Sequence, residues 1–146
     1  MFKSLKEERV EKELERCGVK KTPGRRAVLS FFLKETHPVS IRSVHKAIGT
    51  NKIAHTTIYR TVLLFLSVGL VREIHLQSGE SLFELADRTH HHHLICRFCG
   101  YLEDIHACGL DGWISQVKQG SHRFASIDDH SVELFGTCRE CAKRGE

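Results

Sequence analysis

The sequence predicts an α+β protein of two small domains, the first mainly helical with a hairpin and the second organised around bound metal. Three observations predict it: apolar residues at helical spacing in the first part, two closely spaced cysteine pairs in the second, and an uneven distribution of charge. Residues 1–80 contain 15 Lys and Arg against 8 Asp and Glu, whereas residues 81–146 contain 7 against 10. A positive first domain favours a polyanionic partner, and ordinary surface variation is the alternative. We place the domains at 1–85 and 86–146.

Four helices are predicted in the first domain. Thr22 and Ser40 are expected N-caps, because their side-chain oxygens can accept hydrogen bonds from the first turn, and Pro23 suits the first helical position. The predicted helices cover residues 4–17, residues 23 to about 33, residues 41–48 and residues 55–68.

The fourth predicted helix has two different faces. An apolar stripe at positions i, i+4, i+7 and i+8 consists of Ile58, Val62, Phe65 and Leu66. The opposite face and its flanks carry polar side chains that suit DNA: Thr56, Thr57, Tyr59 and Arg60. Arginine can form two hydrogen bonds with a guanine edge, and threonine and tyrosine can contact phosphates and thymine methyls. A merely solvated helix surface is the alternative.

Two strand-like runs follow this helix, at residues 70–76 and 81–85, joined by the turn Gln77-Ser78-Gly79-Glu80. Helix, short turn, helix and hairpin is the order of a winged helix-turn-helix domain. A compact helical domain with no nucleic-acid partner shows the same order. The basic charge and the polar helix face favour double-stranded DNA.

The second domain is predicted to be a small α+β domain, with strands near 94–95, 101–105 and 131–135 and a helix near 110–117. Its cysteines form two C-x2-C pairs, Cys96 with Cys99 and Cys138 with Cys141. Two such pairs can close a tetrahedral shell of four thiolates around a structural Zn(II) ion. A thioredoxin-like redox pair is the alternative. Cys17 and Cys108 are outside these pairs and are predicted to be plain thiols.

Four consecutive histidines precede the first cysteine pair. Side chains alternate along a strand, so His91 and His93 would share one face and His90 and His92 the other, serving two separate metal sites. A solvent-exposed, weakly chelating run is the alternative. Further ligands must come from elsewhere, and the residues available are Glu84, His37, Asp104, His106, Asp111, His122 and His130.

The N-terminal segment is charged at helical spacing and has no apolar signal-peptide core, which predicts the cytoplasm as the compartment. Disulfides are rare there, so paired cysteines are first interpreted as metal or redox groups. No stretch is long and apolar enough to span a bilayer, so no membrane partner is expected.

Taken together, these stretches resemble the ferric uptake regulator family of metal-responsive regulators. The matching motifs occur in the family's order over residues 20–141: KKTPGRRAVL, HPVS, TTIYRTV, SLFEL, HHHHLICRFCG, DDHSVELFG and CRECA. The resemblance implies a winged-helix domain hinged to an α/β dimerisation domain. It also implies that Tyr59 and Arg60 contact DNA.

The resemblance implies three metal sites. The structural zinc ligands are matched by Cys96, Cys99, Cys138 and Cys141. The regulatory site is matched by His37, Glu84, His91 and His93, with Asp104 as an extra ligand. A further site is matched by His90, His92, Asp111 and His130. This chain departs from the family's usual pattern there: His92 stands where iron-responsive members often have Asp, and Asp111 is shorter than the usual Glu.

The expected function is therefore that of a homodimeric repressor, not an enzyme, whose binding to a DNA operator depends on a sensed metal. Fe(II) and Zn(II) are the expected metals, and Mn(II) also suits a site of nitrogen and oxygen ligands. Two alternatives remain open. One is a zinc-ribbon adaptor or metal-buffering protein with no DNA role. The other is a zinc hydrolase, which would need an open coordination position and a general base.

Overall fold

The computed structural model describes residues 5–49, 52–76, 78–106 and 108–146. The chain divides into two compact units, Met1–Arg88 and Thr89–Glu146. The sequence placed the boundary three residues earlier. Asp87 and Arg88 stay with the first unit because Arg9 Nη2 lies 2.8 Å from Asp87 Oδ2 and Arg88 forms an ion pair with Glu84.

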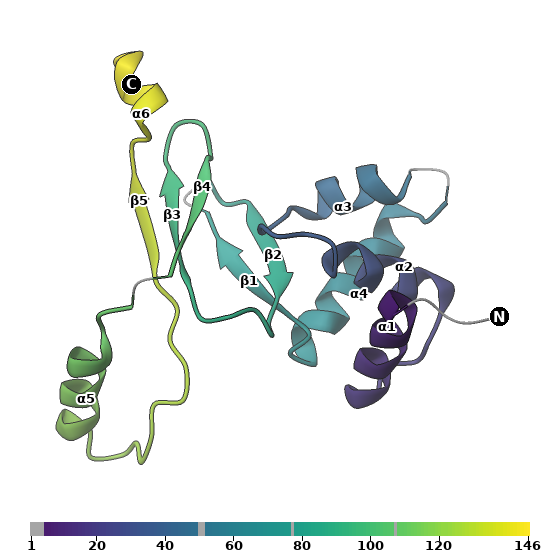
Figure 1. The fold of residues 1–146 in the computed structure, drawn as a ribbon, viewed down its shortest axis with the longest axis horizontal. Coiled ribbons are helices and arrows are strands. Elements are labelled where there is room, and N and C mark those ends of the chain that lie inside the picture. The colour runs from purple at the N-terminus through teal and green to yellow at the C-terminus, as the bar shows by residue number, and fades with distance from the viewer. Residues whose placement is uncertain (1–4, 50–51, 77, 107) are drawn as a thin grey trace. The chain divides into compact units, whose positions relative to one another are not determined.

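Among its described residues the first unit contains four helices (Figure 1): α1 (Leu5–Arg16), α2 (Pro23–Phe32), α3 (Ile41–Ile48) and α4 (His55–Ser67). The two predicted N-caps are present. The Thr22 hydroxyl accepts from the N–H of Arg25 at 3.4 Å, and the Ser40 hydroxyl accepts from the N–H of Ser43 at 3.2 Å. These bonds satisfy backbone donors that the first turn leaves without helical partners.

One apolar core holds the four helices together. On α4, Ile58, Val62 and Phe65 are completely buried, as the predicted stripe requires, while Leu66 is half-buried. They are in one cluster with fully buried residues of the other three helices: Leu14, Val28, Leu29 and Val44. Because α4 buries this stripe, its opposite face is left to solvent.

A two-stranded hairpin completes the first unit. Strands β1 (Val71–His75) and β2 (Ser81–Leu85) pair antiparallel, with Val71 opposite Leu85. An isolated bridge between Val39 and Phe83 joins β2 to the α2–α3 connection. Gln77, in the predicted turn, lies outside the described residues. Helices followed by this hairpin are the elements of a winged helix-turn-helix domain.

The second unit is built on a three-stranded sheet in the order β4-β3-β5. Strand β3 (His92–Cys96) pairs antiparallel with β4 (Leu102–Ile105) and parallel with β5 (Glu133–Gly136). A parallel pair needs a long crossover, and the segment containing α5 (Asp111–Gly120) provides it. A short helix that the sequence did not predict, α6 (Arg139–Lys143), follows β5. Helix α5 has no buried residue.

Candidate metal centres

The four paired cysteines converge at one end of the second unit. Cys96 ends β3, Cys99 lies in the β3–β4 turn, Cys138 is the N-cap of α6 and Cys141 lies within α6. Their four sulfur atoms all lie within 4.8 Å of one another, and Cys99 Sγ is 3.7 Å from Cys138 Sγ. This is the compact, closed arrangement that a tetrahedral structural zinc ion requires.

The backbone around the cysteines positions their sulfur atoms and affects the pKa values of the thiols. Gly100, directly after Cys99, has a φ of 73°, a conformation that glycine adopts without strain and that closes the knuckle. Backbone N–H groups of Cys99 and Cys138 donate to Cys96 and lower the pKa of its thiol to about 6. The nearby Glu146 carboxylate and burial raise the pKa of the Cys141 thiol. A bound dication would let all four sulfurs ionise together.

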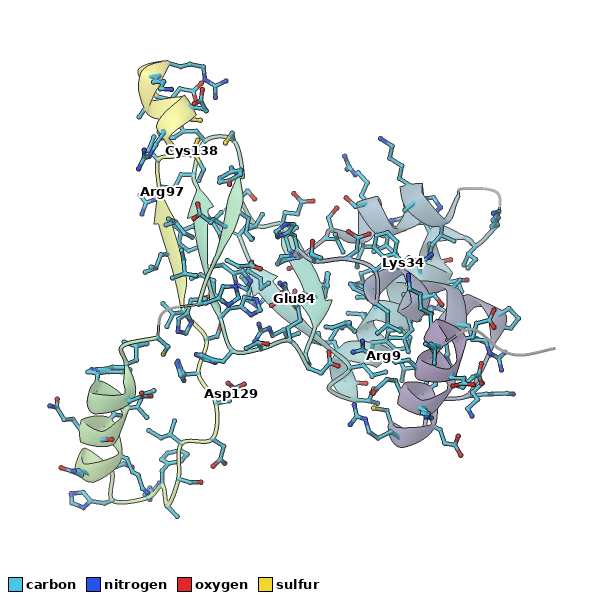
Figure 2. The ribbon with its side chains drawn as sticks, in the orientation of Figure 1. Arg9, Lys34, Glu84, Arg97, Asp129 and Cys138 are labelled. Atoms are coloured by element: carbon cyan, nitrogen blue, oxygen red, sulfur yellow. The ribbon has the colours of Figure 1, made fainter. Side chains whose placement is uncertain are left out.

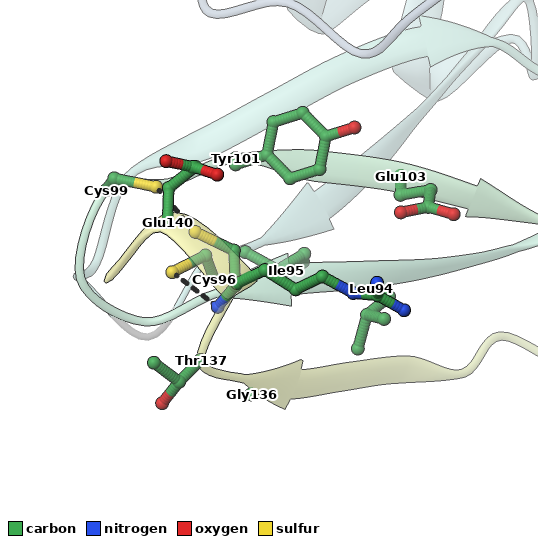
Figure 3. A pocket seen from close by; sticks show the side chains of 11 residues that line it. Leu94, Ile95, Cys96, Cys99, Tyr101, Glu103, Gly136, Thr137 and Glu140 are labelled. Atoms are coloured by element: carbon green, nitrogen blue, oxygen red, sulfur yellow. Dashed lines mark hydrogen bonds between the residues drawn. The ribbon is translucent and has the colours of Figure 1, made fainter. Parts of the chain in front are cut away.

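A pocket of roughly 620 Å³ lies beside these cysteines (Figure 3). Its lining includes Cys96, Cys99 and Cys138 together with Tyr101 and Glu140. Since the sulfurs themselves form part of its wall, we treat it as part of the cysteine centre.

The histidine run divides into two groups, as strand alternation predicts. The rings of His91 and His93 are 4.9 Å apart between centroids, and those of His90 and His92 are 4.7 Å apart. His91, His92 and His93 are at most 5% exposed. A weakly chelating run in solvent is therefore excluded for these three residues.

Within the second unit, His91 and His93 lie beside two further candidate ligands. His93 faces Asp104 across the β3–β4 pair, with Nε2 3.8 Å from Asp104 Oδ1. The His106 ring lies 5.8 Å from that of His91. His91 Nδ1 is 2.6 Å from the carbonyl oxygen of Thr89. That oxygen can only accept, so Nδ1 carries the proton and Nε2 is the nitrogen suited to bind a metal.

Glu84 and His37, the ligands that the resemblance adds, belong to the first unit. Glu84 lies on β2 (Figure 2), and its side chain is buried, with 2% exposed. Arg72 Nε donates to one carboxylate oxygen at 2.6 Å, and Arg88 donates to the other. Two guanidinium groups keep a buried carboxylate ionised. His37 is exposed in the loop between α2 and α3. The roles of both residues as ligands stay predictions.

The other histidine group has a composition that the sequence analysis did not foresee. One ligand atom from each of His90, His92, His130 and Cys108 lies within 4.8 Å of the others. Cys108 Sγ is 3.3 Å from His130 Nε2. Asp111, expected in this group, is instead the exposed first residue of α5 and is not one of the four. Cys108 was interpreted as a plain thiol because it belongs to neither C-x2-C pair.

His92 is the buried centre of this second group. Burial lowers the pKa of its imidazole, and the neighbouring His90 and His130 lower it further. Both effects favour the neutral ring, which is the form that binds a metal.

The polar face of α4 is open to solvent. All four predicted DNA-contacting residues are exposed: Thr56, Thr57, Tyr59 and Arg60. Thr57 and Arg60 also line a shallow depression with Thr22 and Arg25 from the start of α2. The arrangement offers a guanidinium group, hydroxyls and an aromatic ring on one surface, which suits contact with base edges and phosphates.

Known proteins resemble this chain over most of its length. The model of the ferric uptake regulator family matches residues 16–135. A peroxide-responsive repressor of Staphylococcus epidermidis is 31% identical over 136 residues, covering 90% of this chain and 87% of the relative. A zinc uptake regulation protein of Mycobacterium tuberculosis is 33% identical over 128 residues, covering 86% of this chain and 96% of the relative.

Solved structures agree with the fold. The Vibrio cholerae ferric uptake regulator superposes with a TM-score of 0.75 at 26% identity, covering 88% of this chain and 98% of that one. The Helicobacter pylori ferric uptake regulator gives a TM-score of 0.76 at 20% identity, covering 92% and 90%. Within the part of the chain that is described, no helix has the length and apolar character needed to cross a membrane.

Proposed function

This chain belongs to the ferric uptake regulator family, and we propose that it is a homodimeric transcriptional repressor whose binding to a double-stranded DNA operator depends on a bound metal. The observation that carries the proposal is that His91, directly before β3, and His93, within β3, are buried side by side, shortly after the link to the basic, helical first unit. A pair of buried imidazoles beside a carboxylate is a ligand set for a divalent ion.

The sensing ion is bound by His91 Nε2 and His93, with Asp104 from β4 beside them. Family resemblance adds Glu84 and His37 from the first unit. An ion that takes ligands from both units restricts their relative motion. Such an ion acts as a switch only if it binds the restricted state better, and a near-complete shift requires roughly 10⁴-fold preference.

Glu84 is prepared for this role by its surroundings. Its carboxylate is buried and accepts hydrogen bonds from the guanidinium groups of Arg72 and Arg88, which favour its ionised form. Each carboxylate oxygen has two lone pairs, so an oxygen that accepts a hydrogen bond from a guanidinium group can also bind a metal.

The proposed metals follow from the ligand types. The four-cysteine centre binds Zn(II), because four thiolates select a soft or borderline ion in tetrahedral geometry. The sensing site has nitrogen and oxygen ligands that suit Fe(II), Zn(II) or Mn(II). The relatives include both a peroxide-responsive repressor and a zinc uptake regulation protein, so family membership supports more than one sensed signal.

Operator binding is assigned to α4. Arg60 is placed to contact a base edge, and Thr56, Thr57 and Tyr59 to contact phosphates or methyl groups. A homodimer places two such helices in successive major grooves of a two-fold symmetric site. Its interface is assigned to the second unit, which has large exposed apolar side chains at Trp113, Val117, Phe124 and Leu134. We place the protein in the cytoplasm, because that is where the operator DNA of such a regulator is located.

The test is operator binding with controlled metal. The full-length protein, retaining zinc in its cysteine centre, is titrated against labelled DNA from upstream of its own gene and followed by fluorescence anisotropy. We expect chelator-treated protein to bind weakly, and anaerobic Fe(II), Zn(II) or Mn(II) to tighten binding by orders of magnitude. Equal binding with and without metal would contradict the proposal. No specific binding with any of the three metals would favour an adaptor or metal-buffering protein.

A further inference from the structure

We infer that Cys108 is a thiolate ligand of the second histidine group, which makes that group a three-histidine, one-cysteine site for Zn(II). The inference deepens the proposed function by assigning a metal class to one of its sites. It rests on the proposed metal dependence of this chain. It names a ligand that neither the cysteine spacing nor the family resemblance supplied.

The first argument is distance. Tetrahedral zinc with bonds of about 2.0–2.3 Å places nitrogen and sulfur ligands about 3.3–3.8 Å apart. Cys108 Sγ and His130 Nε2 are 3.3 Å apart, and all four ligand atoms lie within 4.8 Å of one another. The group therefore needs only a small contraction around an ion.

The second argument is burial without partners. His92 is 5% exposed, and neither of its ring nitrogens has a hydrogen-bond partner among the described residues. Buried polar atoms in folded proteins are nearly always satisfied. A metal ion bound to one nitrogen would account for this ring, which packs against His90 and His130 at centroid distances of 4.7 and 5.3 Å.

The third argument is the position of the competing carboxylate. Asp111 is exposed in the first turn of α5, where a negative charge is favourable for the helix without any metal. Cys108, three residues earlier, is the residue whose ligand atom joins the histidines. Replacing an oxygen by a thiolate shifts preference toward Zn(II) and away from Mn(II), which favours oxygen ligands.

The placement also gives this ion a structural effect. Cys108 and His130 flank the crossover segment that contains α5, and His92 lies in the central strand β3. Figure 1 shows α5 standing away from the sheet of its own unit. Because α5 buries none of its residues, packing does little to fix this segment. An ion bound by Cys108, His92 and His130 would join both ends of the segment to β3.

Cobalt(II) spectroscopy tests the ligand directly. Full-length protein carrying one zinc in the cysteine centre and the substitutions His91→Ala and His93→Ala is titrated with Co(II), so that the second group is the site filled. We expect the visible bands of tetrahedral cobalt together with a near-ultraviolet thiolate-to-cobalt charge-transfer band. Cys108→Ser should lose the charge-transfer band. It should also weaken zinc binding by more than the roughly 10- to 100-fold that is typical of losing an outer-shell partner.

Asp111→Asn is the matched control and should keep both the band and the zinc affinity. Hydrogen exchange adds a second readout: zinc should slow exchange over residues 109–129, and Cys108→Ser should remove that protection. A missing charge-transfer band in the parent protein would overturn the inference, as would an unchanged band in Cys108→Ser. Retention of one zinc per chain shows that each variant keeps its cysteine centre. Operator binding plays no part here, so its failure would count against the proposed function alone.

Discussion

Single residues show how one short run of histidines can serve two sites. Side chains alternate along the start of β3 and the two residues before it, which separates His91 and His93 from His90 and His92, so four adjacent imidazoles form two groups. A carbonyl hydrogen bond then fixes the tautomer of His91. The direction in which each nitrogen points is therefore set by the backbone.

The residues that the sequence predicted well are those with a local rule. C-x2-C spacing found Cys96, Cys99, Cys138 and Cys141, whose sulfurs the fold brings together. Cys108 has no such rule, because it lies in an irregular segment before α5 and meets His130 across 22 residues of chain. Only the folded crossover brings these two residues together, and neither spacing nor periodicity encodes that contact.

Substitution of Arg60 tests whether α4 contacts the operator DNA. Loss of one bidentate contact with a base costs roughly 1–3 kcal/mol, so Arg60→Ala should raise the Kd for operator DNA by about 5- to 150-fold. Metal binding should be unchanged, because Arg60 lies in the first unit on the exposed face of α4. Arg123→Ala removes the same charge from an exposed position in the second unit and serves as the control. Equal losses in the two variants, measured by anisotropy, would show that α4 is not the reading helix.

Two elements, α4 and β3, contain most of the residues that we propose to bind DNA or metal. Helix α4 buries one face and exposes the other, so the residues that fold the domain are separate from those proposed to contact DNA. Strand β3 contains His92 and His93 and ends at Cys96, so the metal groups of the second unit share one strand. A disturbance of β3 should therefore affect the structural and histidine centres together.

Elements with strong periodicity were predicted from sequence, and those shaped by tertiary contacts were not. The four helices of the first unit follow from the 3.6-residue pattern and from the caps at Thr22 and Ser40. Only Leu94 and Ile95 indicated β3, because the histidines around them carry no strand signal of their own. Helix α6 is five residues long and starts at a cysteine N-cap, so it depends on the cysteine centre more than on propensity.

Removal of one cysteine tests that dependence. Structural zinc contributes roughly 10–16 kcal/mol to small zinc domains, which is comparable to the whole stability of a domain. Cys96→Ser should therefore lose one zinc per chain and lose hydrogen-exchange protection in β3, β4 and α6. Helices α2 and α4 should stay protected, because the first unit has its own core.

Cys17→Ser is the control, since Cys17 is remote in sequence and packs partly against the core of the first unit. It should keep its full zinc content. If Cys96→Ser retained its zinc, or if α2 and α4 lost protection to the same extent, the cysteine centre would not be the support of the second unit alone.

At the scale of the whole molecule, the chain consists of two units with different charge and different chemistry. The basic half coincides closely with the winged-helix unit, and most histidines and cysteines belong to the other. Charge asymmetry and the positions of histidine and cysteine led to the predicted domains 1–85 and 86–146. The ion pair of Arg9 with Asp87 joins residues that periodicity does not connect.

The central claim is that an ion at His91 and His93 controls DNA binding, and the two halves of the histidine run supply a matched pair of variants. Anisotropy titrations with operator DNA, at saturating metal and in chelator, compare His91→Ala/His93→Ala with His90→Ala/His92→Ala. We predict that the first variant keeps its fold and its structural zinc but binds DNA no better with metal than without it. The second should keep most of the metal-dependent gain. A full metal response in His91→Ala/His93→Ala would contradict the account.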